Sequence, residues 1–258
     1  MTPAHPALDP HAPTSPVATS PAPDRSEVRS EIHPLDRPTR AALTGPQAGI
    51  AERRGRVLRF PADVSPWLAL PDEPNGQDWA DLAELVGAGG EFALAATTEV
   101  VPPEGWAETF RVPGVQLVDD GVQAAYDEEA VPLGPADVPE MLDLVARTRP
   151  GPFLERTVEL GGYVGVRRGG ALVAMAGERL RPTGYAEISG VCTDPAYRGQ
   201  GLAGRLVLAV SAGIRDRGEV PFLHTGAENT GAIRLYEQLG FRLRREVAFF
   251  GLRVPGDA

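Results

Sequence analysis

The sequence has one cysteine and no long hydrophobic run, and both shortages narrow what the protein can be. Cys192 cannot form an internal disulfide, and together with four scattered histidines it offers no plausible zinc-ligand spacing. No apolar run reaches the roughly 18 residues that a membrane-spanning helix needs. The first residues also lack the basic start and the apolar stretch of a secretory signal. We therefore expect a cytoplasmic protein with no metal centre and no membrane span.

Positive charge is also in short supply, because the formal net charge is −10 at pH 7. A surface of this sign repels phosphate backbones and anionic lipids, so neither nucleic acid nor a membrane is expected as a main partner. Any phosphate-bearing cofactor must then be held by local groups. A cationic acceptor is mildly favoured.

Composition divides the 258 residues into three parts. Residues 1–25 form a proline-rich tail of a composition typical of disorder. Residues 26–127 contain "RVLRF", "DWADLAELVGAG" and "EFALAAT", which predict a strand, a helix and a strand of an accessory α/β domain. This part has no recognisable reactive cluster. Residues 128–258 form a second unit, in which the elements are easier to assign.

That second unit predicts a regular α/β order. The segment "GPADVPEMLDLVART" predicts a helix with Asp137 as its N-cap, and "GYVGVRRGGALVAMAGERL" predicts two strands around a tight turn at residues 168–170. "GYAEISGVCT" predicts a third strand. A long amphipathic helix follows from apolar residues that recur every four positions, namely Leu202, Leu206, Val210 and Ile214. "EVPFLHTG", "NTGAIRLYEQLG" and "FRLRREVAFFGL" then predict a strand, a short helix that ends at Gly240, and a closing strand. The order is α-β-β-β-α-β-α-β.

Residues 199–204 spell G-x-G-x-x-G, which raises the question of a dinucleotide site. A dinucleotide-binding turn needs a strand that runs directly into the first glycine and an acidic residue at the end of the next strand. Here Asp194 and Pro195 place a loop before Gly199, and Glu219 precedes the next strand. Too little sequence follows to complete a doubly wound sheet. A nicotinamide oxidoreductase is therefore disfavoured.

A different motif fits the same residues. Arg198-x-x-Gly201-x-Ala203 resembles the acetyl-CoA signature of the GCN5-related N-acetyltransferase (GNAT) superfamily, which lies between that fold's fourth strand and third helix. A second motif of the superfamily is matched at the correct spacing by Asn229, Ala232, Tyr236, Gly240 and Phe241. The resemblance covers residues 130–253. It implies a GNAT fold, a mixed central sheet flanked by helices, and an acetyl-CoA-dependent N-acetyltransferase.

Longer segments narrow the resemblance to one branch. "EISGVCTDPAYRGQGLA" and "PFLHTGAENTGAIRLYEQLGF" look like the branch that contains the C-terminal domain of animal glycine N-acyltransferase. In that branch the preceding residues form a degenerate copy of the same fold, which is the expectation for residues 26–127. Kinship with glycine acylation suggests a small amino-acid-like amine as acceptor, although a peptide amine fits as well.

The resemblance also implies a set of cofactor-binding residues. A helix start offers unpaired N–H groups and the positive end of the helix dipole, which suit a pyrophosphate. The expected phosphate cradle is the backbone of Gly199, Gln200, Gly201, Leu202, Ala203 and Gly204, with Arg198 as a flanking cation. The backbone of Val191, Cys192 and Thr193 resembles the strand end that pairs with the pantetheine arm. Asn229 either touches that arm or only caps the following helix.

Acetyl transfer to an amine requires two proton movements. An alkyl ammonium of pKa about 10.4 must lose a proton, and a leaving thiolate, whose thiol has a pKa near 8.5, benefits from an acid. Tyr236 stands at the superfamily's general-acid position. Glu187 is the expected base, because its spacing to Arg198 resembles that of the base in the histone-acetylating branch. His224 and a water chain are alternative bases, whereas Cys192 is expected to be a small apolar filler.

A second function class stays open at this stage. The chain can also be an acyl-CoA-binding regulatory or interaction module that keeps the fold without turnover. Tyr236 and Glu187 favour the enzyme, while the featureless residues 26–127 are compatible with assembly, including a homodimer.

Overall fold

The computed structural model describes residues 32–96 and 100–256. The proline-rich residues 1–25, predicted to be a disordered tail, lie outside this part of the chain. Among the described residues, no helix is long and apolar enough to cross a membrane. The same residues contain no group of three or more His, Cys, Asp or Glu side chains that could hold a metal ion.

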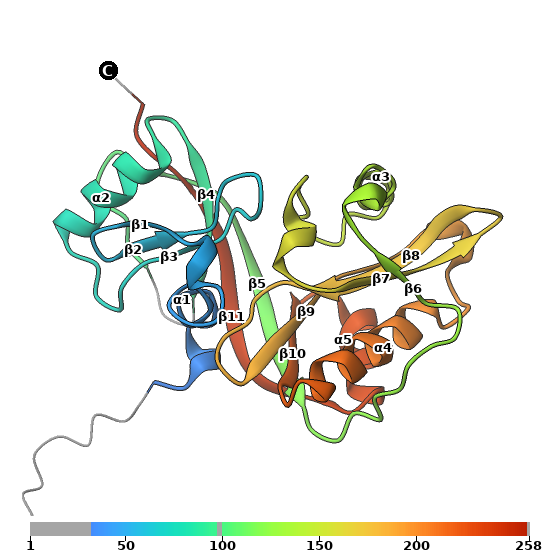
Figure 1. Ribbon diagram of the computed structural model, residues 1–258. Helices are drawn as coiled ribbons and strands as arrows, with labels where there is room; N and C mark the ends of the chain where they lie inside the picture. Colours follow the sequence, from blue (N-terminus) through green and yellow to red (C-terminus); the bar gives the residue numbers. More distant parts are fainter. Residues whose placement is uncertain (1–31, 97–99, 257–258) are drawn as a thin grey trace, which may run out of the picture. The chain divides into compact units, whose positions relative to one another are not determined.

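An eight-stranded mixed sheet runs through most of the described chain (Figure 1). In spatial order its strands are β4 (Glu91–Ala96), β11 (Phe241–Arg253), β5 (Ala107–Asp119), β10 (Val220–Gly226), β9 (Tyr185–Thr193), β8 (Ala171–Glu178), β7 (Tyr163–Arg168) and β6 (Val131–Leu133). The β9–β10 pair is parallel and the other neighbouring pairs are antiparallel.

The elements that precede β4 include a second, small sheet. They are η1 (Pro34–Asp36), α1 (Pro38–Leu43), η2 (Ala48–Ile50), β1 (Glu52–Arg54), β2 (Val57–Arg59), β3 (Leu68–Ala69) and α2 (Gly76–Val86). Helix α2 begins in a capping box, in which Asn75 accepts from the amide of Asp78 while the Asp78 carboxylate accepts from the amide of Asn75. Trp79 and Leu82 form its buried face. The strand, helix and strand predicted from "RVLRF", "DWADLAELVGAG" and "EFALAAT" are thus confirmed as β2, α2 and β4.

The predicted order of the second unit is also confirmed. The remaining helical elements are η3 (Pro135–Asp137), α3 (Val138–Thr148), η4 (Thr157–Leu160), η5 (Pro195–Tyr197), α4 (Leu202–Asp216) and α5 (Thr230–Gln238). Asp137 precedes α3, but its side chain makes no cap hydrogen bond to that helix. Instead it accepts from the amide of Gly134 and pairs with Arg167, because the 3-10 turn η3 moves its carboxylate away from the first turn of α3.

The helices cover both faces of the sheet. Leu206, Val207 and Ile214 of α4 are fully buried in a core that also contains Tyr236 of α5 and the inner side chains of β8, β9 and β10. Met141 and Leu144 of α3 pack on the other face, with Met175 of β8 and Cys192 of β9. Figure 1 shows α4 and α5 on one side of β9 and β10, with α3 on the opposite side. The mixed α/β fold class predicted from the sequence is confirmed.

The boundary expected at residues 127 and 128 does not separate two sheets. β4 and β5 precede it, yet β5 inserts between β10 and β11, and β4 extends the same sheet beyond β11. The inner half of β5 contributes buried Val115 and Leu117 to the core under α4 and α5. Residues from His33 onward accordingly form one compact unit. Pairing on both edges of β5 is a tertiary effect that its own sequence does not encode.

All 25 basic residues are arginines, and the chain contains no lysine. Many of these guanidinium groups bind carboxylates through two nitrogens, a geometry that a lysine ammonium cannot reproduce. Arg205 on α4 binds Asp127 in this way, and Arg215 on the same helix binds Asp119 at the end of β5. These pairs attach the segment between β5 and β6 to helix α4.

Gly240 gives the first testable prediction. Its φ of 100° follows the last turn of α5, and a Cβ there would lie 2.9 Å from backbone atoms of Gly121 and Val122. Gly240→Ala should therefore lower the free energy of unfolding by at least about 1–2 kcal/mol, which urea denaturation measures. Gly213→Ala in the last turn of α4 is the matched control, because a Cβ at Gly213 meets nothing within 4 Å. That variant should gain about 0.5–1 kcal/mol, and equal effects at the two positions would contradict the assignment.

Candidate active site

The site begins where two parallel strands separate. β9 and β10 are in register from Tyr185 opposite Val220 to Ile188 opposite Leu223, and then share no further pair although both strands continue. β9 carries a bulge against β8 at this point, and Gly190 has a φ of 63°. A bulge with a left-handed residue bends a strand and increases its twist. The result is a gap between the strand ends, with one edge of β9 left unpaired.

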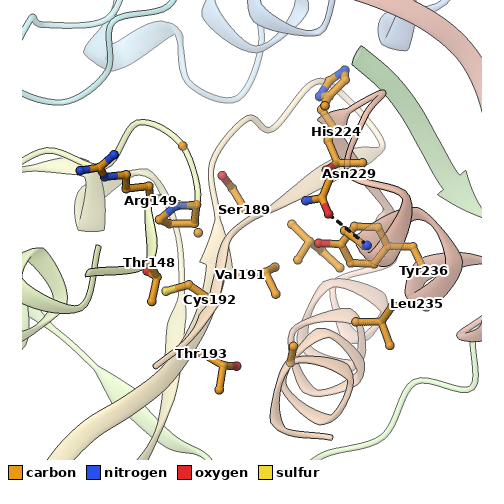
Figure 2. A pocket seen from close by; sticks show the side chains of 18 of the residues that line it. Thr148, Arg149, Ser189, Val191, Cys192, Thr193, His224, Asn229, Leu235 and Tyr236 are labelled. Carbon is orange, nitrogen blue, oxygen red and sulfur yellow. Dashed lines mark hydrogen bonds between the residues drawn. The ribbon is translucent and has the colours of Figure 1, made fainter. Parts of the chain in front are cut away.

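A cavity of about 910 Å³ occupies this gap. Gly199, residues 201–204, Asn229 and Tyr236 line one part of it, on the side of α4 and α5. Trp67, His224 and Phe249 line another part, on the face of the sheet that the N-terminal residues cover. Figure 2 shows the residues around it. The cavity thus joins the two faces of the sheet through the gap.

The loop predicted to bind phosphate contains two glycines in the left-handed region and leads into α4. Gly199 and Gly201 have φ values of 78° and 74°, and a Cβ at either would meet no atom within 4 Å. Gly201 is the N-cap of α4, and the first amide of the helix to find a carbonyl is that of Arg205. In the described part of the chain, the six amides of residues 199–204 have no hydrogen-bond partner. A concentration of unpaired N–H groups at a helix start suits an oxyanion.

Charge at the cavity is opposite to that of the whole chain. Among the described residues, its charged lining consists of Arg149, Arg179, Arg198 and a single carboxylate, Glu228. Arg198 donates to the Thr193 carbonyl at 3.4 Å and has no carboxylate partner within the described residues. The net charge of −10 therefore misleads about this surface, and the mild preference for a cationic acceptor inferred from it finds no support in the lining.

The three strand residues predicted to bind the cofactor lie at the unpaired edge of β9. Val191, Cys192 and Thr193 line the cavity, and Cys192 and Thr193 are paired on their other edge with β8. The Thr193 hydroxyl is buried without a hydrogen-bond partner in the described chain. In Figure 2 the Cys192 sulfur points toward Thr148, away from Tyr236. Burial raises the pKa of the Cys192 thiol to about 11, so it is protonated at neutral pH and packs as a small apolar group.

Asn229 has at least one structural role. Its side-chain oxygen accepts from the amide of Ala232 at 3.2 Å and caps α5, as Figure 2 shows. This leaves the side-chain NH₂ group without a partner in the described chain, and the residue lines the cavity. Capping and a cofactor contact are compatible, because they use different atoms.

Tyr236 is buried against Phe241 but presents its hydroxyl to the cavity. The residue is 7% exposed, and its hydroxyl has no hydrogen-bond partner among the described residues. Figure 2 shows this hydroxyl pointing into the space on the side of Val191. Burial raises the pKa of Tyr236 to about 12. The phenol therefore remains protonated at neutral pH and is available as a donor.

Glu187 occupies a different environment from the one expected of a free base. Its carboxylate is fully buried and binds the Arg179 guanidinium at 2.7 and 3.0 Å. It also accepts from Nδ1 of His224 at 2.7 Å. Burial alone would raise the pKa of this carboxyl, but the charge of Arg179 and the hydrogen bond of His224 outweigh burial and lower it. Glu187 is thus a stable anion within an ion pair.

The hydrogen bond between His224 and Gln116 indicates which nitrogen of the His224 ring donates and which accepts. Arg244 donates to the side-chain oxygen of Gln116 at 2.9 Å, and an arginine can only donate. The Gln116 nitrogen must then be the atom that faces the Leu35 carbonyl at 2.9 Å and Nε2 of His224 at 3.0 Å. In this arrangement Nε2 of His224 accepts from Gln116 and Nδ1 donates to Glu187. We name this row of side chains the polar row: Arg179, Glu187, His224, Gln116 and Arg244.

The polar row bears on the choice of base. A carboxyl with a lowered pKa is a poor acceptor for a proton from an alkyl ammonium of pKa about 10.4. Both ring nitrogens of His224 are occupied by Glu187 and Gln116. The base role of Glu187 stays a prediction, and the geometry supports instead a role in holding the ring of His224 at the cavity wall.

The sequence analysis did not identify four residues that line the cavity. Trp67 comes from the loop before β3, Phe110 and Val112 come from β5, and Arg149 follows α3 in a left-handed conformation with a φ of 51°. No periodicity connects these positions, because they come from separate elements, and Phe110 and Val112 reach the cavity only through the insertion of β5 into the sheet. Ser189, which also lines the cavity, could have been predicted, since it lies two residues beyond Glu187 on the same strand.

The ion pair in the polar row gives the second prediction. Glu187→Leu leaves Arg179 buried and unpaired, and should lower the free energy of unfolding by about 3–5 kcal/mol. The double variant Arg179→Met with Glu187→Leu should recover most of that loss. Urea denaturation measures both changes, and a double variant no more stable than the single would contradict the pairing.

Acid provides an independent check on the same pair. Because the folded pKa of Glu187 lies below its ordinary value of 4.5, the folded state binds fewer protons near that pH than the unfolded state. The stability that this group contributes is present above pH 4.5 and is lost as the pH falls through the folded pKa. The free energy of unfolding should therefore fall more steeply with acid in the original protein than in the double variant.

Comparison with known proteins agrees with this architecture. A family model described as FR47-like protein matches residues 163–250. N-alpha-acetyltransferase RimI of Mycobacterium tuberculosis is 38% identical over 84 residues, which are 31% of this chain and 51% of RimI. Mycothiol acetyltransferase of Thermobispora bispora is 46% identical over 61 residues, which are 23% of this chain and 20% of that protein. The matches thus span about half of RimI and a fifth of mycothiol acetyltransferase.

Solved structures extend the similarity to the residues before β6. A GCN5-related N-acetyltransferase from Kribbella flavida has a TM-score of 0.55 at 16% identity, over 85% of this chain and 96% of that one, which shows a shared fold. A GNAT-family protein from Novosphingobium aromaticivorans, assigned as an acetyltransferase, is 43% identical with a TM-score of 0.79, over 88% of this chain and 100% of that one. Since this identity extends over the whole of that relative, the chain belongs to the GNAT family of acetyltransferases.

Proposed function

We propose that this protein is an acetyl-CoA-dependent N-acetyltransferase that acts on a primary amine of a small amino-acid-like molecule or a peptide. One observation carries the proposal: the unpaired amides of Gly199 and of residues 201–204 and the hydroxyl of Tyr236, which has no partner in the described chain, belong to residues that line the same cavity. A binding module needs the first feature, whereas only a transferase needs the second. Similarity to RimI, which is an N-alpha-acetyltransferase, also supports an amine as the acceptor.

The residues present fit the CoA moiety. The amides of residues 199–204 would hold its pyrophosphate, and Arg198, without a carboxylate of its own, would supply a cation. The unpaired edge of Val191, Cys192 and Thr193 would pair with the amide groups of the pantetheine arm, as a further strand does in a sheet. When bound, acetyl-CoA supplies an activated acetyl group and a thiol leaving group.

The reaction we propose is direct attack of the amine on the thioester in a ternary complex. The N–C bond forms, the C–S bond breaks, and the amine proton ends on the thiol product. Tyr236 would donate a hydrogen bond to the sulfur as negative charge develops there. With a pKa of about 12 against about 8.5 for a thiol, the phenol stabilises the leaving group better by hydrogen bonding than by full proton transfer.

The acceptor ammonium must first lose a proton. Glu187 and His224 remain candidates from the sequence, with the restriction that the polar row occupies their acceptor atoms. Glu228 is a further candidate, because it is the carboxylate on the cavity wall and has no cation partner within the described residues. Water that enters the cavity completes the set, and the pH profile of kcat/KM of a Glu228→Gln variant separates these routes.

Several finer predictions stay proposals. The branch akin to glycine N-acyltransferase, a cytoplasmic location and a homodimer rest on the sequence reasoning alone. The alternative function, a silent acyl-CoA-binding module, makes the same use of residues 199–204 but gives Tyr236 no chemical task.

Tyr236→Phe tests the proposed function. The phenyl ring keeps the packing against Phe241, so affinity for acetyl-CoA should be unchanged, while kcat should fall about 10²-fold or more in a thiol-release assay. Tyr126→Phe is the matched control, since the Tyr126 hydroxyl binds Asp216 and does not line the cavity. Absence of amine-dependent thiol release in every form would favour the binding module.

Ala203→Asp tests the phosphate loop without disturbing the fold. Ala203 is the second residue of α4, where a carboxylate favours the helix dipole but repels a phosphate. We expect unchanged or slightly higher thermal stability and at least tenfold weaker binding of acetyl-CoA by calorimetry. Gln77→Asp places a carboxylate at the same position of α2, away from the cavity, and should leave binding intact. Equal binding by the two variants would argue against residues 199–204 as the phosphate site.

A further inference from the structure

We propose that the acceptor amine carries an apolar, preferably aromatic, group, and that Trp67, Phe110, Val112 and Phe249 hold this group. We name these four residues the apolar wall. The inference rests on the proposed function and specifies its substrate class.

The apolar wall is contiguous by register and by ring contacts. Val112 of β5 is directly opposite Phe249 of β11, and Phe110 lies two residues before Val112 on the same face of β5. The ring centroids of Trp67 and Phe249 are 5.6 Å apart. All four side chains line the cavity. Together they form one surface assembled from three separate stretches of the chain.

Two side chains of the apolar wall are exposed to solvent, although apolar side chains on a strand are usually covered by other parts of the protein. Phe110 is 43% exposed and Val112 is 44% exposed. The cause is topological: β10 ends at Gly226 opposite Gly114, so residues 107–113 of β5 continue past the last strand on that edge. Two adjacent exposed apolar side chains at the rim of a cavity are typical of a ligand-binding surface.

Charge on the cavity lining limits what else the acceptor can be. A polyamine requires several carboxylates, and in the described part of the chain the lining offers only Glu228 beside three arginines. Arg179 uses Nε and Nη2 on Glu187, and its Nη1 has no hydrogen-bond partner in the described chain. The guanidinium also stacks on Trp67, 5.3 Å from the ring. It can therefore bind a carbonyl or carboxylate oxygen of an acceptor whose apolar group contacts Trp67. An apolar amino acid or its amide satisfies each of these conditions.

A set of matched amines tests this substrate class. L-phenylalaninamide and glycinamide share the α-amine and the carbonyl and differ in the side chain, while spermidine represents the polycations. We expect kcat/KM for thiol release to be at least tenfold higher with L-phenylalaninamide than with glycinamide, and lowest with spermidine. Equal rates for the two amides, or a preference for spermidine, would overturn the inference while leaving the proposed function intact.

Variants locate the preference on the apolar wall. Phe110→Ser and Val112→Ser each remove a partly exposed apolar side chain, and each should reduce the ratio of kcat/KM for L-phenylalaninamide to kcat/KM for glycinamide tenfold or more. Leu243→Ser is the matched control, because Leu243 is 46% exposed on β11 and does not line the cavity. An unchanged preference in both wall variants, with all proteins folded by thermal denaturation, would also overturn the inference.

A binding measurement keeps the inference testable if no amine supports thiol release, an outcome that counts against the proposed function. Calorimetry of L-phenylalaninamide with the full chain in the presence of CoA should then show binding that is at least tenfold weaker in Phe110→Ser than in Leu243→Ser. Equal affinity for L-phenylalaninamide and glycinamide in the unmodified chain would refute the apolar wall.

Discussion

The separation of β9 from β10 is the constraint on which the remainder of the structure depends. Two parallel strands that share pairs from Tyr185 to Ile188 would ordinarily continue as a closed ladder. The bulge against β8 and the left-handed Gly190 end that ladder and leave main-chain groups of β9 unpaired. Unpaired main-chain groups are tolerated only at a surface or where a ligand completes them. The same local event therefore accompanies the cavity and leaves main-chain groups with which an extended amide-bearing molecule would pair.

A gap in a sheet weakens the sheet locally, and the polar row lies across the strands beside it. Arg179, Glu187 and His224 link the end of β8 to β9 and β10, and the row continues through Gln116 to β11. Each side chain of the polar row forms a hydrogen bond with the next one, and the buried charge of Glu187 is compensated by that of Arg179. The row also binds the Leu35 carbonyl, and Arg244 binds Asp36, so the N-terminal residues are held at the wall of the cavity. Fold and site are consequently stabilised by the same side chains.

The sequence allowed much of this to be predicted, for reasons that are local. Helix α4 followed from apolar residues every four positions, and the loop at residues 199–204 followed from glycines whose positive φ values no other residue adopts easily. The insertion of β5 could not be predicted, because both of its partner strands come more than 100 residues later in the chain. The environment of Glu187 was equally inaccessible. Its spacing to Arg198 says nothing of Arg179, which approaches it from the residue that follows the neighbouring strand β8.

The exclusive use of arginine has a chemical consequence for a chain that would hold an activated acetyl group. Lysine side chains are nucleophiles once deprotonated, and an acetylated lysine loses its charge and its ion pair. A guanidinium group keeps its proton throughout the physiological range and does not compete for the acetyl group. With no lysine in the sequence, the pairs that attach Arg205 and Arg215 to their carboxylates are not subject to acetylation at a lysine. The ion pairs of this chain thus offer no lysine side chain to the reagent that its cavity would concentrate.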